Sequence, residues 1–185
     1  MAFASEFKYE DELEELELLD SEYETGKWKT QDWVELHRSV DGSFEVRVSG
    51  FGWNADRPIL KEKPTGEVLK KHDEAVNEIV DEIKKIFARG ACVDIGVNGY
   101  VDWGSEWKES EKTSNNRADF FLSRIWKKLL GYQARVKDHQ TTGVWKPSKK
   151  PTHRELVASG AWPGDTPRER MLNRRVQVSV NPTRC

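Results

Sequence analysis

The sequence predicts an α+β fold, a two-layer sandwich in which two main helices cover one face of a mixed β-sheet. Three observations predict it. Two alternating apolar runs flank Asp41-Gly42 and predict a β-hairpin. Apolar residues recur every three or four positions over 66–89 and 113–130, which predicts two helices. Strand-like runs at 91–97 and 133–142 and near the C-terminus complete the order hairpin, helix, strand, helix, strand, strand, and a helix between two strands favours a parallel crossover.

The length and composition indicate one polar domain with an extension. The chain has 185 residues, of which 36% are hydrophobic and 34% charged, and its eight tryptophans can supply much of a modest core. We place an acidic extension at residues 1–30 and the domain at 31–185. No apolar run approaches the roughly 18–20 residues of a membrane span, and the first residues lack the features of an ordinary secretory signal. We therefore expect synthesis in the cytoplasm and no membrane span, and leave the final compartment open.

Negative charge is concentrated at the N-terminus. Residues 1–24 hold ten acids and one lysine, a net −9, so the other 161 residues carry +7 of the total −2. Such a segment can fold onto the basic body, dock on a partner or stay a solvated leader. We expect any protein partners to engage residues 1–49, which comprise this segment and the hairpin.

Local signals predict where the elements begin and end. Thr113 or Ser114 is expected to begin the second helix, and Asn98-Gly99 to end the strand 91–97. His72 lies on the apolar stripe of the first helix and is expected to be structural rather than a ligand. The hairpin residues expected to face the core are Val34, Leu36, Val40, Phe44, Val46 and Val48.

Metal, cofactor and catalytic chemistry find little support. Cys92 lies in an apolar run and is expected to be a small core residue, and Cys185 is expected to be mobile at the chain end, so no disulfide framework is predicted. Four scattered histidines show no zinc-site spacing, and no nucleophile elbow or carboxylate pair appears. Lysines at 146–150 beside Trp145 suggest nucleic-acid binding, but a charged surface loop explains them better. We expect no enzyme, metal, cofactor or nucleic-acid partner.

Two adjacent arginines, Arg174 and Arg175, lead into the last strand. Successive side chains of a strand point to opposite faces, so one of them must face the covered side or its rim. A buried guanidinium needs a carboxylate or carbonyl partner. The pair therefore predicts an acid elsewhere in the chain, such as Asp94 or Asp102.

Two motifs resemble the signatures of the OmpA-like domain, the family that includes Pal lipoproteins and the periplasmic part of MotB. That family has a threonine, an arginine and then Asn-Arg-Arg-Val before its closing strand. The matching residues are Thr166, Arg170, Asn173, Arg174, Arg175 and Val176. A second signature, Gly-His-Thr-Asp followed by a helix with Leu-Ser-x-x-Arg-Ala, is matched in degenerate form. Its counterparts are Gly99, Asp102, Ser114, Arg117 and Ala118. The resemblance covers residues 44–181.

The resemblance implies a βαβαβ core that binds the peptide stem of peptidoglycan without catalysis. Asp102 and Arg117 would hold the ammonium and carboxylate of diaminopimelate, with Ser114 and Gly104 beside them. The start of the helix would assist the carboxylate bound at Arg117. Arg170 joins Asn173, Arg174 and Arg175 as the structural signature.

The chain departs from the family pattern, and this leaves alternatives open. Tyr100-Val101 stands where the family has His-Thr, so Asp102 and Arg117 could instead form an internal salt bridge with the ligand lost. The first functional hypothesis is a peptidoglycan-binding module that anchors a protein or particle to the cell wall. The alternative is a structural or adaptor subunit of a phage-tail-like or contractile injection assembly that keeps the fold without binding peptidoglycan.

Overall fold

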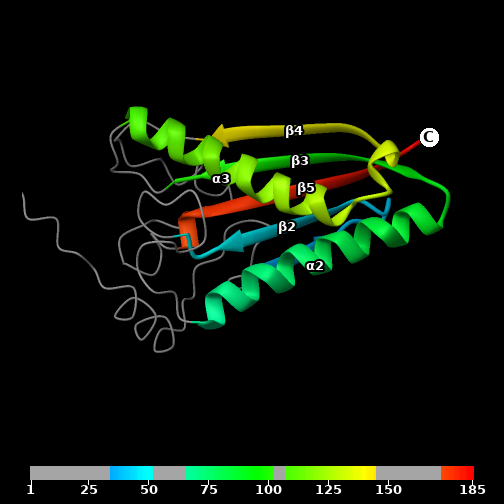
Figure 1. The fold of residues 1–185 in the computed structure, drawn as a ribbon, viewed down its shortest axis with the longest axis horizontal. Helices are drawn as coiled ribbons and strands as arrows, with labels where there is room; N and C mark the ends of the chain where they lie inside the picture. Colours follow the sequence, from blue (N-terminus) through cyan, green and yellow to red (C-terminus); the bar gives the residue numbers. More distant parts are fainter. Residues whose placement is uncertain (1–33, 52–65, 102–106, 145–171) are drawn as a thin grey trace, which may run out of the picture.

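The computed structural model describes residues 34–51, 66–101, 107–144 and 172–185 (Figure 1). Neither described helix is long and apolar enough to cross a membrane. The boundary predicted after residue 30 and the acidic segment lie outside the described residues and stay predictions. The elements are β1 (Val34–Arg38), β2 (Phe44–Ser49), α2 (Gly66–Ala88), β3 (Cys92–Tyr100), α3 (Trp107–Lys128), a 3₁₀ turn (Gln133–Arg135), β4 (Val136–Val144) and β5 (Arg175–Thr183).

The strands form one mixed sheet in the order β1-β2-β5-β3-β4. The C-terminal strand β5 lies in the centre, antiparallel to both β2 and β3. Strands β3 and β4 are parallel and are joined through α3. Both helices cover the same face of the sheet (Figure 1). The predicted two-layer α+β architecture is confirmed.

The core follows the period of two along each strand. On β2 and β5 the buried side chains that face the helices pair in register, as Val46 does with Val178 and Val48 with Val176. Ile79 and Ile83 of α2 and Phe121 of α3 are fully buried in the same cluster. The opposite face of the sheet is polar, with Arg47, Arg175 and other polar residues at the alternate positions.

The hairpin prediction is confirmed, apart from one residue. Gly42 has φ +86°, a conformation that glycine adopts at little steric cost, and the carboxylate of Asp41 accepts hydrogen bonds from the backbone N–H and the hydroxyl of Ser43. Val40 was expected to face the core but lies fully exposed in the turn. The expectation was wrong because β1 already ends at Arg38.

Two predicted boundaries, the end of β3 and the start of α3, were wrong. Strand β3 continues through Asn98-Gly99 to Tyr100, although this dipeptide was expected to end it. A Cβ on Gly99 would lie 1.9 Å from the carbonyl oxygen of Ser114, so a glycine is needed where the helix backbone contacts the strand. Helix α3 begins at Trp107, so neither Thr113 nor Ser114 begins it. The Ser114 hydroxyl donates back to the carbonyl of Glu111.

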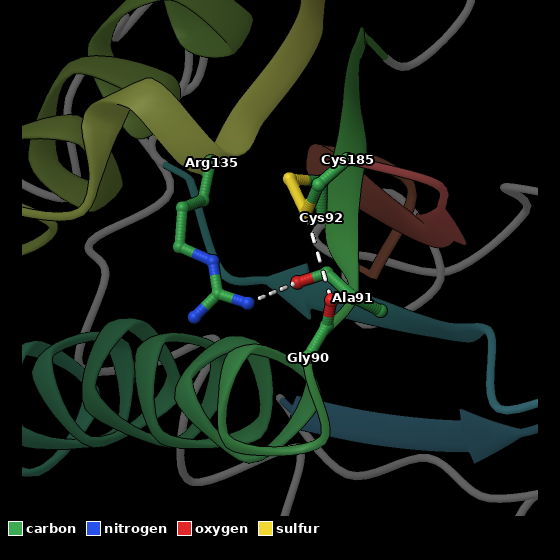
Figure 2. The surroundings of a disulfide bond; sticks show 5 residues. All are labelled: Gly90, Ala91, Cys92, Arg135 and Cys185. Carbon is green, nitrogen blue, oxygen red and sulfur yellow. Dashed lines mark hydrogen bonds between the residues drawn. A yellow bond between two sulfur atoms is a disulfide. The ribbon is translucent and has the colours of Figure 1, made fainter.

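A disulfide joins Cys92 to Cys185, so the expectation of a mobile Cys185 and no disulfide was wrong, whereas Cys92 is buried in the core as expected. The pairing of β3 with β5 places Thr183 opposite Cys92, which brings the chain end beside the start of β3. The two Cα atoms are 5.1 Å apart, within the range of disulfides. Figure 2 shows the bond beside Gly90 and Ala91, where Arg135 donates to the Ala91 carbonyl (2.9 Å).

Loss of the disulfide should lower the melting temperature. The cysteines are 93 positions apart, and a crosslink that closes a loop of roughly 100 residues is worth about 4–5 kcal/mol in the chain-entropy estimate. We expect a reductant to lower the melting temperature of the wild type by roughly 10 °C or more in calorimetry. The C92A/C185A variant should melt near the temperature of the reduced wild type, and the reductant should not change its melting temperature. Equal melting temperatures of the oxidised and reduced wild type would contradict a stabilising role of the disulfide.

Substitution of Gly99 by alanine should destabilise the fold. The added Cβ would meet backbone atoms of α3, which cannot move away without shifting the helix. We expect a loss of about 2 kcal/mol or more in urea unfolding, as for overpacking of a tight core. Gly96 on the same strand is the control, because its Cβ would meet only the hydroxyl of Ser179 (2.7 Å). A smaller loss for G99A than for G96A would contradict the packing argument.

Candidate functional site

The candidate site lies at one end of the sheet, which we term the site end. Here β2 and β3 end and β5 begins: Ser49 pairs with Arg175, and Gly99 pairs with Val176. Both helices begin on this side, whereas the chain terminus lies at the opposite end (Figure 1). The topology therefore brings together the two sequence motifs, which are about 70 residues apart.

Arg117 reaches from α3 to the end of β3. Its Nη1 donates a hydrogen bond to the carbonyl oxygen of Tyr100 (2.6 Å), and its guanidinium carbon lies 5.4 Å from the centroid of the Phe51 ring. The side chain is buried, with 1% exposure. The expectation that the start of the helix assists a carboxylate bound at Arg117 was wrong, because α3 begins ten residues earlier at Trp107 and the dipole effect fades beyond the first turn.

Arg174 and Phe51 tie the start of β5 to the segment after β2. The Nε of Arg174 donates to the carbonyl of Phe51 (2.7 Å), and the N–H of Phe51 donates to the carbonyl of Arg174 (3.2 Å). Both residues are buried. Phe51 thus contacts both Arg174 and Arg117, and it links the two motifs on the helix side of the sheet.

Arg175 lies on the opposite face of the sheet from Arg174. Its guanidinium carbon is 3.9 Å from the centroid of the Tyr100 ring, and its Nη1 donates to the carbonyl of Asn173 (3.1 Å). Burial lowers the pKa of Arg175 to about 10, while Tyr100 and Glu35 act to raise it. Both adjacent arginines are therefore covered, one on each face, and the prediction of carbonyl or acidic partners is confirmed.

The acid among the described residues that acts on Arg175 is Glu35 of β1. Asp94 was proposed from the sequence, but it pairs with Asn181, six residues along β5 from Arg175, or roughly 20 Å. That prediction was wrong because the antiparallel register places Asp94 towards the other end of the sheet. Asp102, the other candidate, lies outside the described residues.

Glu35 and Arg47 form a buried ion pair that sequence reasoning missed. They stand directly opposite each other on β1 and β2, and their side chains are 6% and 0% exposed. Burial lowers the pKa of Arg47 to about 9; the charge of Glu35 raises it and that of Arg175 lowers it further. A signal was available: the Asp41-Gly42 turn fixes the hairpin register, and this register places Glu35 opposite Arg47.

His72 packs under the site from α2. Its Nε2 is hydrogen-bonded to the carbonyl of Ser49, its ring lies 5.1 Å from that of Phe51, and it is fully buried. A carbonyl accepts, so Nε2 carries the proton of the neutral ring. Burial, the largest cause, lowers the pKa of His72 to about 4. The prediction of a structural histidine is confirmed.

The remaining predicted site residues divide into two groups. Ser114 is fully buried, and a Cβ on Gly143 would lie 2.5 Å from its hydroxyl, so its described role is packing of α3 against β4. Asp102, Gly104 and Arg170 lie outside the described residues and stay predictions. Within the described part of the chain, no group of three or more His, Cys, Asp or Glu residues could hold a metal ion.

Comparison with known proteins identifies the fold. No protein-family profile matches the sequence, and no curated protein matches it significantly. Among solved structures, the cell wall anchor of the T6SS from Pseudomonas aeruginosa superposes with a TM-score of 0.52 at 17% identity, covering 82% of this chain and 89% of that one. The periplasmic domain of MotB superposes with a TM-score of 0.50 at 13% identity, covering 99% of this chain and 88% of that one.

The chain has the OmpA-like fold. The resemblance inferred from the two motifs is thereby confirmed at the level of the fold. Within this OmpA-like fold, the C-terminal arginine pair starts the central strand and the helix arginine reaches the end of β3.

His72 should make the fold sensitive to acid. Its pKa is about 4 when folded and 6.5 when unfolded, so the unfolded state takes up a proton first as the pH falls. The difference amounts to roughly 3 kcal/mol, present above pH 6.5 and lost as the pH falls towards 4. H72Q keeps a donor for the Ser49 carbonyl but does not titrate. Between pH 7.5 and 4.5, we expect its free energy of unfolding in urea to fall by roughly 3 kcal/mol less than that of the wild type.

The exposed His37 on β1 provides the matched control, since H37Q makes the same change outside the core. The H37Q variant should keep the pH dependence of the wild type. An unchanged pH dependence in H72Q would show that acid sensitivity arises elsewhere.

Proposed function

We propose that the protein is a non-catalytic peptidoglycan-binding module that recognises the diaminopimelate-containing stem peptide and anchors a protein or particle to the cell wall. The observation that carries the proposal is Arg117, which is held at the end of β3 by its hydrogen bond to the Tyr100 carbonyl. Asp102 follows Tyr100 by two residues in the chain. Chain connectivity therefore keeps an anion close to this cation, as a zwitterionic amino-acid end requires.

The chemistry of the pair suits diaminopimelate. Its side chain ends in an ammonium and a carboxylate on one carbon, so Asp102 would take the ammonium and Arg117 the carboxylate. A guanidinium has five N–H donors in a fixed fork, so one of them can donate to a carbonyl while others engage a carboxylate. The carbonyl of Tyr100 would in this way orient the group that binds.

Two further observations support the proposal. The OmpA-like fold is shared with a protein described as the cell wall anchor of the T6SS. The Cys92–Cys185 disulfide suits an oxidising environment, and peptidoglycan lies outside the reducing cytosol. Both fit a protein that works at the cell envelope.

A second function is an adaptor subunit of a phage-tail-like or contractile injection assembly that keeps the fold without the ligand. The burial of Arg117 and its contacts with Tyr100 and Phe51 favour this reading, because they give the arginine a structural role of its own. Protein partners through residues 1–49 would fit either function.

Sedimentation with purified sacculi should separate the two functions. We expect the wild type to bind diaminopimelate-type sacculi, and D102N and R117K each to weaken binding by about tenfold or more. D102N removes the anion, and R117K keeps the charge but loses the fork geometry of the guanidinium. Sacculi with lysine stems, which lack the second carboxylate, should bind weakly. R124K is the control on the same helix, two turns from Arg117.

Circular dichroism should first establish that each variant is folded. Equal sedimentation of wild type, D102N and R117K would contradict the specific site. Absence of binding by the wild type would favour the adaptor function.

A further inference from the structure

Four side chains, one from each of four adjacent strands, follow one another across the polar face at the site end. Glu35 of β1 is ion-paired with Arg47 of β2. On β5, the residue paired with Arg47 is Gln177, and Arg175 lies two residues before it, opposite Ser49. Beyond it, the guanidinium of Arg175 covers the Tyr100 ring of β3 at 3.9 Å. We term these residues, Glu35, Arg47, Arg175 and Tyr100, the charge row.

The three charged members of the charge row are buried, and Tyr100 is half-buried. Glu35 is 8% exposed, and Arg47 and Arg175 are 0% and 1% exposed. Screening between such buried charges is weak, so their mutual interactions are much stronger than those of surface pairs. Arg47 and Arg175 repel each other, and the carboxylate of Glu35 attracts both.

The charge row ends at the residue that orients Arg117. The Tyr100 ring is held under Arg175 on one face of the sheet, and the Tyr100 carbonyl accepts from Arg117, which approaches from the helix side. One residue therefore joins the charge row to the proposed ligand site. A shift of its ring alters the strand end that presents this carbonyl.

We propose that Glu35 is a positioning residue for the ligand site: its carboxylate offsets the repulsion between Arg47 and Arg175, so that Arg175 stays on Tyr100 and Tyr100 holds Arg117. Nothing in the OmpA-like signatures of this chain includes Glu35 or Arg47. The identity of the ligand rests on the proposed function, but the effect of Glu35 on Arg175 and Tyr100 does not. Because β1 is an edge strand, the outermost strand on one side of the sheet thereby influences a site on β3.

The first experiment reads Tyr100 directly and needs no ligand. The chain has four tyrosines, so 3-fluorotyrosine labelling gives few ¹⁹F resonances, and Y100F assigns that of Tyr100. In E35Q, which removes the charge at nearly constant shape, we expect the Tyr100 resonance to shift or broaden. H37Q, a substitution at the exposed position two residues along the same strand, should leave it in place. An unchanged Tyr100 resonance in E35Q would overturn the proposal.

A double variant separates charge from packing. In E35Q/R47Q the repulsion between Arg47 and Arg175 is removed, so the Tyr100 resonance should return towards the wild-type position. E35D keeps the charge on a shorter side chain and should give an intermediate result. A shift in E35Q that persists undiminished in both variants would indicate a packing defect and overturn the electrostatic account.

The second experiment measures binding to diaminopimelate-type sacculi, with each variant first shown to be folded. We expect E35Q to weaken binding several-fold and E35Q/R47Q to restore most of it, with H37Q unaffected. Wild-type binding that E35Q leaves intact would overturn the positioning role. If the wild type itself does not bind, the proposed function fails, while the fluorine spectra still decide whether Glu35 positions Tyr100.

Discussion

Arginine side chains are buried where the central strand begins, and the site end is built to satisfy them. Arg47, Arg117, Arg174 and Arg175 are each at most 3% exposed. Removing a guanidinium from water is costly unless hydrogen bonds and opposite charge replace the lost hydration. Here the replacement comes from three carbonyls, one ring and one carboxylate: the carbonyls of Phe51, Tyr100 and Asn173, the ring of Tyr100 and the carboxylate of Glu35. The ends of β2 and β3 and the start of β5 are thereby fixed to one another.

The central strand connects this end to the other. Strand β5 begins at Arg175 and runs between β2 and β3, and the chain then ends in the disulfide to Cys92. Apolar side chains from both helices pack on its middle. Polar contacts at one end and a covalent bond at the other hold the strand in register. A rigid sheet of this kind suits a protein whose proposed task is to hold a ligand rather than to change it.

In the proposed function, Arg117 serves the fold and a ligand together. Its contact with the Tyr100 carbonyl stabilises the packing of α3 on β3, and the same contact orients a cation beside the segment that leads to Asp102. Gly99 permits this arrangement, because a side chain there would displace the backbone of α3. In the proposed positioning role, the Glu35 carboxylate acts from three strands away through Arg175 and Tyr100. The proposed binding role would therefore share its contacts with the structural one.

The sequence by itself determined the elements and the face that each one buries, because turn chemistry and hydrophobic periodicity are local. Asp41-Gly42 predicted the hairpin, the apolar stripes predicted the helices, and the arginine pair indicated a covered strand with polar partners. Only the tertiary structure decided what depends on pairing between distant strands. It placed Cys185 beside Cys92, kept Gly99 within β3, and made Glu35 rather than Asp94 the described acid near Arg175. These contacts follow from the insertion of β5 between β2 and β3, which no local pattern encodes.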